Sequence, residues 1–283
     1  MFTGKKLIVS LALSALAASA GENKAVYVIT AAQQFGIVDL ETGGFQAIGP
    51  GTPEVDSDLV HGPNGTLYSL GSFTGSLVSI DPETGATTVI GPTGLGTNAF
   101  SLAEASGRLY LTDFQNNLYS VDASTGHATL IGPTGMPPDP HVPFTFNADG
   151  TFNLCDEILL GVGDKLYATF DSYRLNTTTL AMDFLVAPDL WEIDPRTGAA
   201  TLVASTSPNM ETLVRVDGRF YAFRLQITGF SSTVGPEAIN QLLTLDLANG
   251  VTEFVREIDP AAGPIFGAVP VHDRPRLRWH APE

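Results

Sequence analysis

Residues 67–94 read LYSLGSFTGSLVSIDPETGATTVIGPTG, and residues 109–135 read LYLTDFQNNLYSVDASTGHATLIGPTG. Each segment contains an apolar-aromatic strand, a polar turn, a second strand that ends in Asp, a T-G turn, and a third strand that ends in I-G-P-T-G. Internal repeats built from several short strands indicate an architecture of small, repeated β-sheets. This pair sets the fold class, and the rest of the chain extends the pattern in both directions.

The turn between the second and third strands recurs five times. Its copies begin at Asp39, Asp81, Asp122, Asp194 and Asp246, and each ends in Gly four residues later. An Asp side chain accepts hydrogen bonds from backbone amides of its own turn, and Gly supplies the positive φ from which the chain enters the next strand. We therefore interpret these five Asp residues as turn formers and not as catalytic groups.

A fourth strand precedes the L-Y or F-Y pair of each repeat. Aligned on the Tyr of the following strand, these segments start at Asp58, Phe100, Glu157 and Glu211. Units of four strands and roughly 40 residues are typical of β-propeller blades.

The two ends of the chain complete one more unit. Three strands at 25–30, 35–40 and 44–49 have no strand before them, and one strand at 265–271 has none after it. If these pair, they form a fifth blade and leave no open sheet edge. The sequence therefore predicts an all-β fold over residues 21–272, a five-bladed β-propeller with four-stranded blades, closed by pairing of the N- and C-terminal strands.

The first 20 residues are distinct from the repeats. Lys5 and Lys6 form a basic start, residues 7–16 are apolar, and Ala18-Ser19-Ala20 is a small-residue cleavage signal. This order predicts a signal peptide at 1–20, and its apolar stretch is too short for a membrane span. We expect a secreted or periplasmic bacterial protein. Residues 273–283 form an Arg-rich C-terminal tail.

The composition limits the classes of molecule that the protein is expected to bind. The chain has 30 acidic residues against 14 Lys and Arg, a net charge of −16 at pH 7. Such a chain repels phosphate backbones, so we expect no nucleic-acid partner. A single cysteine, Cys155, excludes an intrachain disulfide. We expect a monomer that binds a protein or carbohydrate ligand.

The pattern L-Y-x-[IVL]-D-x-x-T-G-x-x-x-x-I-G-P-T-G resembles the repeats of secreted bacterial β-propeller proteins of uncharacterised function. The resemblance covers nearly all of the chain beyond residue 20, and the copies at 67–94 and 109–135 match well. The last two units depart from it, with residues 202–204 and 254–256 where I-G-P would stand. The resemblance implies the fold and export, and it implies no active site.

Three insertions interrupt the regular spacing, at 136–153, 171–189 and 228–240. The first insertion precedes the first strand of a unit, and the other two lie between the second and third strands of a unit. These connections all lie on one face of a propeller, and additions to one side of a rigid scaffold are where binding sites usually lie. Aromatic residues in or beside the insertions either line a ligand groove or fix the long segments in place. Those named for this role are Phe144, Phe146, Phe152, Phe170, Tyr173, Phe184 and Trp191.

One polar constellation is a candidate site. Equivalent positions of the repeat lie at equal height around a propeller axis, which places Asp58, Phe100, Glu157, Glu211 and Phe266 together. Two residues before the first four stand Asp56, Asn98, Cys155 and Asn209, and Asp156 adjoins Glu157. We expect Asp56, Asp58, Asn98, Asp156, Glu157, Asn209 and Glu211 to surround the mouth of the central channel on the insertion-bearing face.

Several kinds of chemistry fit these residues. Asp58, Glu157 and Glu211 supply oxygen ligands that suit Ca²⁺. Glu157, Glu211 and Asp58 also suit the acid, the base and the stabiliser, respectively, of a polysaccharide-acting glycoside hydrolase or lyase, because converging carboxylates separate one another's pKa values. In a third interpretation, these polar residues at strand starts only form hydrogen bonds with the neighbouring backbone. No G-x-S-x-G, P-loop, H-E-x-x-H or C-x-x-C motif is present.

These observations predict a binding or scaffold protein that recognises its ligand on the insertion-bearing face, with Ca²⁺ as an optional cofactor. A hydrolase or lyase and a purely structural envelope component are the alternatives.

Overall fold

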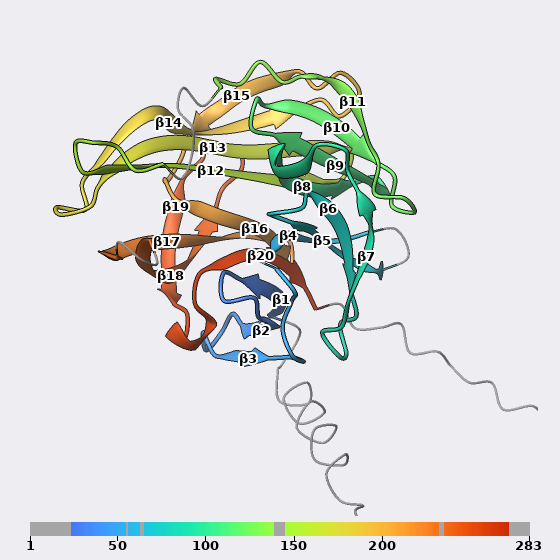
Figure 1. Cartoon of the computed structure of the whole chain (residues 1–283), viewed down its shortest axis with the longest axis horizontal. Coiled ribbons are helices and arrows are strands. Elements are labelled where there is room, and N and C mark those ends of the chain that lie inside the picture. Colours follow the sequence, from blue (N-terminus) through green and yellow to red (C-terminus); the bar gives the residue numbers. More distant parts are fainter. Residues whose placement is uncertain (1–23, 55, 63–64, 139–144, 232–234, 272–283) are drawn as a thin grey trace, which may run out of the picture.

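Five antiparallel sheets of four strands each make up the protein, in a computed structural model that describes residues 24–54, 56–62, 65–138, 145–231 and 235–271. We number these sheets as blades 1 to 5 (Figure 1). From the innermost strand outward, blade 1 contains β20 (Ile265–Pro270), β1 (Ala25–Thr30), β2 (Phe35–Asp39) and β3 (Phe45–Ala47). Blade 2 contains β4 (Asp56–His61), β5 (Leu67–Gly71), β6 (Ser76–Ile80) and β7 (Thr87–Pro92).

The other three blades follow in chain order. Blade 3 contains β8 (Ala99–Ala105), β9 (Arg108–Asp113), β10 (Asn117–Val121) and β11 (Ala128–Pro133). Blade 4 contains β12 (Thr151–Val162), β13 (Lys165–Asn176), β14 (Met182–Ile193) and β15 (Ala200–Ser205). Blade 5 contains β16 (Met210–Val216), β17 (Arg219–Ser231), β18 (Gly235–Leu245) and β19 (Thr252–Glu257). Short 3-10 turns occur at Gly96–Asn98 and Pro260–Ala262.

The ring closes where the two ends of the chain meet. β20 pairs antiparallel with β1, in a register that places Val28 opposite Ala268 and Tyr27 opposite Val269. The innermost strand of each blade lies against the innermost strands of both neighbours, in the order β20, β4, β8, β12 and β16. The predicted five-bladed propeller, closed by its terminal strands, is confirmed.

The hydrophobic core lies between the blades. One cluster of buried side chains joins each neighbouring pair; between blades 2 and 3, for example, Tyr68 and Leu70 pack with Leu102 and Leu109. Between blades 1 and 5, Val28 packs with Phe223 in the same way. Successive residues of an inner strand are buried, as in β5, because a blade packs both of its faces against its neighbours.

The recurrent turn has the predicted chemistry. In the copy that begins at Asp81, the Oδ1 atom accepts the backbone N–H groups of Glu83 at 2.8 Å and of Thr84 at 3.2 Å. Gly85 then takes a φ of 68°, a conformation that favours glycine over residues with a Cβ atom. The Asp residue therefore builds the turn, as the sequence predicts.

The I-G-P and T-G motifs explain each other, because they touch across neighbouring blades. A Cβ atom on Gly91 of blade 2 would lie 2.2 Å from the backbone oxygen of Thr125, in the T-G turn of blade 3. One on Gly49 of blade 1 would lie 2.0 Å from the backbone oxygen of Thr84 in blade 2. Glycine is required at these positions by the close approach of two backbones.

A side-chain hydrogen bond also crosses every junction between blades near the axis. Each bond joins a polar side chain on one blade to a backbone group of the next. In ring order they are His61 Nε2 to the Pro270 oxygen (2.8 Å), Leu102 N to Asp58 Oδ2 (2.9 Å), Leu159 N to Ser101 Oγ (2.8 Å), Asn209 N to Asp171 Oδ2 (3.1 Å) and Ala268 N to Thr212 Oγ1 (3.2 Å).

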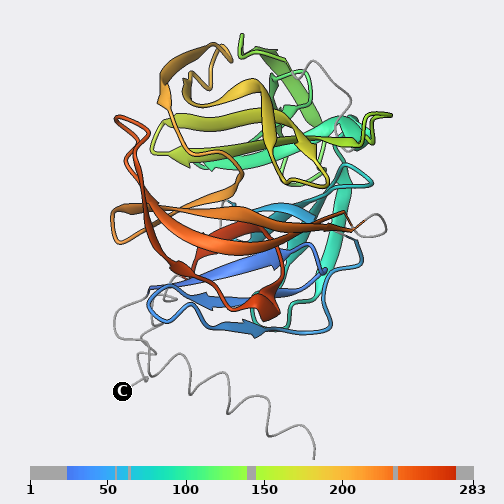
Figure 2. The same cartoon turned by 90° about the vertical axis from the view of Figure 1, so that its left-hand side faces the viewer.

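Much of the predicted insertions continues the strands of blades 4 and 5. β12 and β13 stay paired from Val162 opposite Lys165 out to Thr151 opposite Asn176, and β17 and β18 pair out to Ser231 opposite Gly235. These extensions leave the ring together on one side, at the left of Figure 1. Figure 2 looks at this side of the molecule. Below we call it the extended face and the opposite side the plain face.

Candidate functional site

The aligned position of the innermost strands coincides with a break in the β-ladder. The register between the first two strands of a blade shifts at Asp58, at Phe100, at Glu211 and at Phe266. A β-bulge leaves its residue out of the ladder and redirects its side chain, and Asp58 accordingly has a φ of 53°. The sequence alignment thus found a real structural equivalence around the axis.

Blade 4 departs from this rule. β12 runs through Asp156 and Glu157 in regular register with β13, so the two side chains point to opposite faces of the sheet. They form two groups: Asp156 interacts with Glu211, Asp171 and Tyr173, whereas the charges that act on Glu157 are those of Asp58 and Asp113.

The acids around Asp156 affect one another's ionisation. Burial raises the pKa of Asp156 to about 7, and its interactions with Glu211 and Tyr173 oppose this shift. Burial, followed by the negative charges of Asp156 and Asp171, raises the pKa of Glu211 well above its ordinary value. Tyr173 lies on β13, where that strand extends beyond the ring.

Asp58 and Glu157 make the second group. Glu157 is 7% exposed, and the side chain of Thr112 interacts with its carboxyl group and opposes the effect of burial on its pKa. Burial, followed by the charge of Asp58, raises its pKa to about 8. Asp58 is 5% exposed. Burial raises its pKa to about 8 as well, although the Leu102 backbone N–H opposes this shift.

The structure brings together only part of the predicted ring. Asp58, Asp156, Glu157 and Glu211 influence one another's ionisation. Asn209 is buried, and its backbone N–H donates to Asp171. The remaining predicted positions lie differently: Asn98 is exposed in its 3-10 turn, Phe100 stacks on Phe114 with ring centroids 4.2 Å apart, Phe266 is half-buried in β20, and the side chain of Asp56 lies outside the described residues.

Asp171 was missed in the sequence as a member of the acidic group around Asp156, which is separate from the axial cavity. It lies opposite Asp156 in the β12–β13 hairpin, and burial followed by the charge of Asp156 raises its pKa well above the ordinary value. β12 and β13 are joined at Gly163-Asp164, and counting the same number of residues along both strands from this turn pairs Asp156 with Asp171. That signal is readable only if 171–189 is taken as a continued strand and not as a loop insertion.

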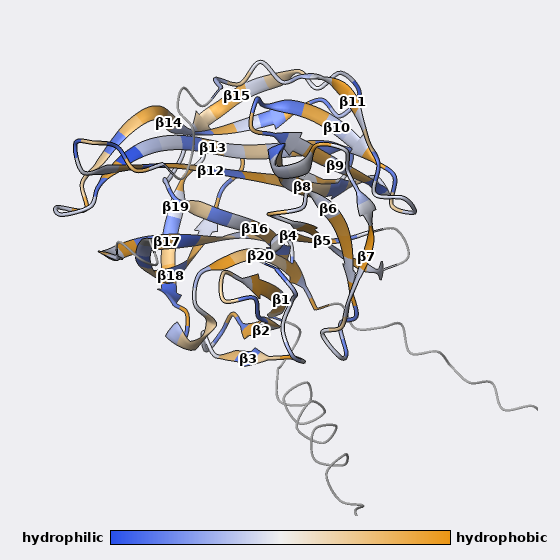
Figure 3. Cartoon of the chain, viewed as in Figure 1, coloured by the Kyte–Doolittle hydropathy of each residue, from blue (hydrophilic) through white to orange (hydrophobic). Residues whose placement is uncertain are grey.

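An aromatic cluster joins the extensions of blades 4 and 5. The ring centroids of Phe146 and Phe152 lie 4.8 Å apart, and each lies 5.5 Å from that of Phe230 on β17. Phe146 is 54% exposed and Phe184 on β14 is 39% exposed, whereas Phe152 and Tyr173 are buried. Figure 3 shows an apolar stretch on the projecting part of β14. The aromatics therefore fix the extensions in place and also reach the surface; Phe144 lies outside the described residues.

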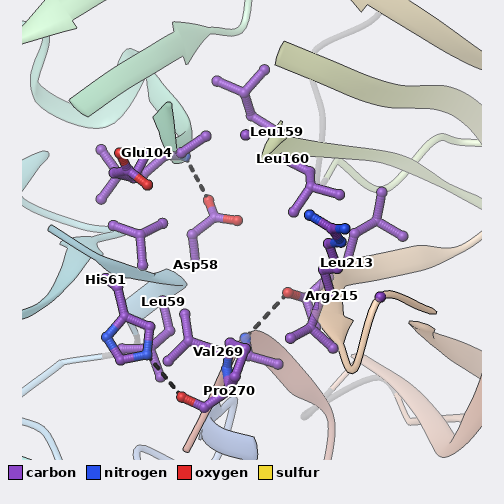
Figure 4. A pocket seen from close by; sticks show the side chains of 18 residues that line it. Asp58, Leu59, His61, Glu104, Leu159, Leu160, Leu213, Arg215, Val269 and Pro270 are labelled. Atoms are coloured by element: carbon purple, nitrogen blue, oxygen red, sulfur yellow. Dashed lines mark hydrogen bonds between the residues drawn. The ribbon is translucent and has the colours of Figure 1, made fainter. Parts of the chain in front are cut away.

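The propeller has a cavity on its axis that opens on the plain face. This cavity of about 380 Å³ is lined by the C-terminal halves of the five innermost strands. Exposed Arg215 and Gly218 border its open end, and buried Asp58 lies at its inner end (Figure 4). Of the three carboxylates predicted as metal ligands or as acid, base and stabiliser, Asp58 lines this cavity, and Glu157 and Glu211 do not.

Neither a metal-binding cluster nor a membrane-spanning helix is found in the part of the chain that the structure describes. Within the described ranges, no three His, Cys, Asp or Glu side chains form a group that could hold a metal ion. The same part of the chain has no helix of the length and apolarity needed to cross a bilayer. The signal peptide predicted at 1–20 and the tail at 273–283 lie outside the described residues.

Comparison with known proteins yields a match in shape alone. No protein-family model matches the chain, and no curated protein matches it. A solved structure described as "Crystal structure of Nidogen/Laminin Complex" contains a chain similar to this one at 12% sequence identity and a TM-score of 0.49. The alignment covers 87% of this chain and 97% of that one.

Proposed function

We propose that this protein is an exported β-propeller that binds a protein or carbohydrate partner on its extended face. The observation that supports this most is the joining of two neighbouring blades on that face by Phe146, Phe152 and Phe230. Strands of 11 to 13 residues project there, and projections from a rigid scaffold commonly carry recognition. The order of basic, apolar and small residues at 1–20 supports export.

The exposed rings are the contact residues that we assign. Phe146 and Phe184 both lie on the extended face, where they are 54% and 39% exposed. Aromatic side chains supply much contact area for little conformational entropy, and they are enriched at the energetic centres of interfaces. We therefore assign Phe146 and Phe184 to the centre of the partner-binding surface.

The hydrolase and lyase alternatives receive less support from the geometry. Acid–base hydrolysis of a glycoside needs two carboxyl groups on either side of the bond, and the axial cavity contains the Asp58 carboxyl but neither Glu157 nor Glu211. The acids near Tyr173 lie beside the blade 4 extension, where Asp156 and Glu211 are half-buried and Asp171 is 4% exposed. A binding surface does not require access to them.

The test compares two double variants in binding assays against a glycan array and a panel of exported proteins. Phe146→Ser with Phe184→Ser removes the assigned contact residues. Leu130→Ser with Leu202→Ser is the matched control, because these residues are 57% and 51% exposed but lie on the outer strands β11 and β15. Binding that is lost in the first variant and kept in the second supports the proposal.

Two outcomes would overturn it. Loss of binding in the control alone would move the surface to the outer strands. Turnover of a glycan that disappears in Glu157→Gln would make the protein an enzyme. Export is tested separately, by the N-terminal sequence of the protein recovered outside the cytoplasm, which we expect to begin at Gly21.

A further inference from the structure

The axial cavity on the plain face is built differently from the extended face. Its walls are aliphatic, with Leu59, Leu102, Leu160, Leu213 and Val269 among the residues that line it. Its volume of about 380 Å³ falls in the range of small-molecule sites, which are mainly apolar with a few placed polar groups. The cavity therefore has the size and lining of a ligand site, separate from the proposed partner surface.

One carboxyl group is placed at the inner end, and a bound cation would favour its ionised form. Asp58 is only 5% exposed, and its Oδ2 atom accepts a hydrogen bond from the Leu102 backbone N–H at 2.9 Å. The other carboxylate oxygen points into the cavity (Figure 4). The bulge at Asp58 and its φ of 53° hold the side chain in this direction. A carboxylate aimed into an apolar cavity recognises a group that donates hydrogen bonds and carries positive charge.

The protein supplies no such cation to Asp58 within the described residues. Arg215 borders the open end, but it is exposed, and its guanidinium carbon lies 5.7 Å from the centroid of the Phe220 ring. His61 donates from Nε2 to the Pro270 oxygen. Glu104 at the rim is acidic, and Glu157 and Glu211 beyond Asp58 carry no positive charge in either protonation state.

The lining favours an organic cation over a metal ion. Ca²⁺ takes six to eight oxygen ligands, and the described residues contain no group of three side chains that could hold a metal. An ammonium group on a carbon chain matches both parts of the cavity, because its N–H groups bond to the carboxylate while the chain contacts the aliphatic walls. The innermost strands are paired on one edge only, so their second edges also offer backbone carbonyls towards the axis.

We propose that the axial cavity binds an organic ammonium ion, with Asp58 holding the ammonium group and the aliphatic walls holding its carbon chain.

The experiment is calorimetric titration of the full chain with n-hexylammonium, and n-hexanol as the uncharged probe of the same length. We expect binding of the ammonium and none of the alcohol. Asp58→Asn should weaken binding about tenfold or more, because a charged hydrogen bond is lost. Asp171→Asn is the matched control: it removes a buried carboxyl of the same axial region that does not line the cavity, and it should leave binding unchanged.

A second variant keeps the test independent of the stability of Asp58→Asn. Leu160→Trp leaves Asp58 intact but fills part of the cavity, and it should also abolish binding. Equal binding of hexanol, or equal loss in Asp58→Asn and Asp171→Asn, would overturn the proposal. Displacement of the ammonium by Ca²⁺ at equal concentration would replace it with a metal site. Loss of Phe146 and Phe184 should not affect this binding, which separates the two proposals.

Discussion

Blades 2 and 3 and blades 4 and 5 solve the same packing problem with different sequences. In blades 2 and 3 the outer strand ends in I-G-P-T-G, and the glycine allows its backbone to touch the T-G turn of the next blade, as Gly91 touches Thr125. In blade 4 the strand register places Val203-Ala204-Ser205 at that point, one residue later than the sequence alignment suggests. Here the Ser205 backbone oxygen approaches Gly250 of blade 5.

The difference shows which part of the motif is required. The turn glycine is kept in all five blades, and the outer-strand glycine is lost where the blades are extended. Blades 4 and 5 have strands of up to 13 residues and an additional aromatic cluster outside the ring. The extended blades therefore rely less on close backbone contact at the rim and more on side chains added on one face.

The largest expected effect tests this contrast at the rim. Gly91→Ala places a Cβ atom 2.2 Å from a backbone oxygen that is fixed in the next turn, and overpacking of this kind costs about 2 to 3 kcal/mol of unfolding free energy. Ala204→Gly, at the equivalent position of blade 4, should cost only about 0.5 to 1 kcal/mol. Denaturant unfolding of both variants measures the difference. Similar losses would show that the two rims are packed alike.

The next effect concerns the buried acid of blade 4. The pKa of Glu157 is raised from 4.5 to about 8, so the native state binds its proton more tightly than the unfolded state does. This contribution to the unfolding free energy is fully present below the unfolded pKa and is lost as the pH rises through about 8. Glu157→Gln removes this pH dependence and should stabilise the protein by about 1 to 3 kcal/mol at about pH 8.5.

Chemical denaturation at about pH 5 and about pH 8.5 checks this prediction. Glu253→Gln, on the exposed outer strand β19, is the control and should leave the pH dependence as it is in the unaltered protein. If Glu157→Gln stabilised the protein, relative to the unaltered chain, more at the acidic pH than at the alkaline pH, the sign would be reversed and the assigned burial effect would be wrong.

The sequence predicted the ring for a physical reason. Turns such as Asp81 to Gly85 are local, and their chemistry is written in adjacent residues. The half-blades at the two ends followed from counting strands, and the pairing of Val28 with Ala268 confirmed them. Equivalence of Asp58 and Glu211 followed from the repeat, and both lie at bulges.

The character of the site could not be predicted in the same way. The regular register of β12 sends Asp156 and Glu157 to opposite faces, and this depends on a hairpin longer than the repeat. The walls of the axial cavity are leucines and valines, such as Leu102 and Leu213, which look like ordinary core residues in the sequence. Burial of the acids depends on residues distant in the chain, so the sequence placed them at an open mouth.

A smaller effect concerns the extensions. Phe146→Ala removes one ring from the cluster with Phe152 and Phe230, and an aromatic pair contributes about 0.5 to 1.5 kcal/mol. We expect faster amide hydrogen exchange in the projecting parts of β12 and β17, with no change in β5 and β6. Phe73→Ala is the control, because Phe73 is 67% exposed in the short blade 2 and should change neither region. Faster exchange throughout the ring would show that the extensions are part of one cooperative unit.

The smallest expected effect concerns calcium. Asp58, Glu157 and Glu211 carry the right oxygen atoms, yet β12 points Asp156 and Glu157 apart, and within the described chain no three acidic, His or Cys side chains form a metal-binding group. A tight site would stabilise the native state in proportion to the logarithm of the ion concentration. We expect the melting temperature to be the same in millimolar Ca²⁺ and in EDTA. A rise with Ca²⁺ that disappears in Glu211→Gln would instead show that an ion binds between the group around Asp156 and the pair of Asp58 and Glu157.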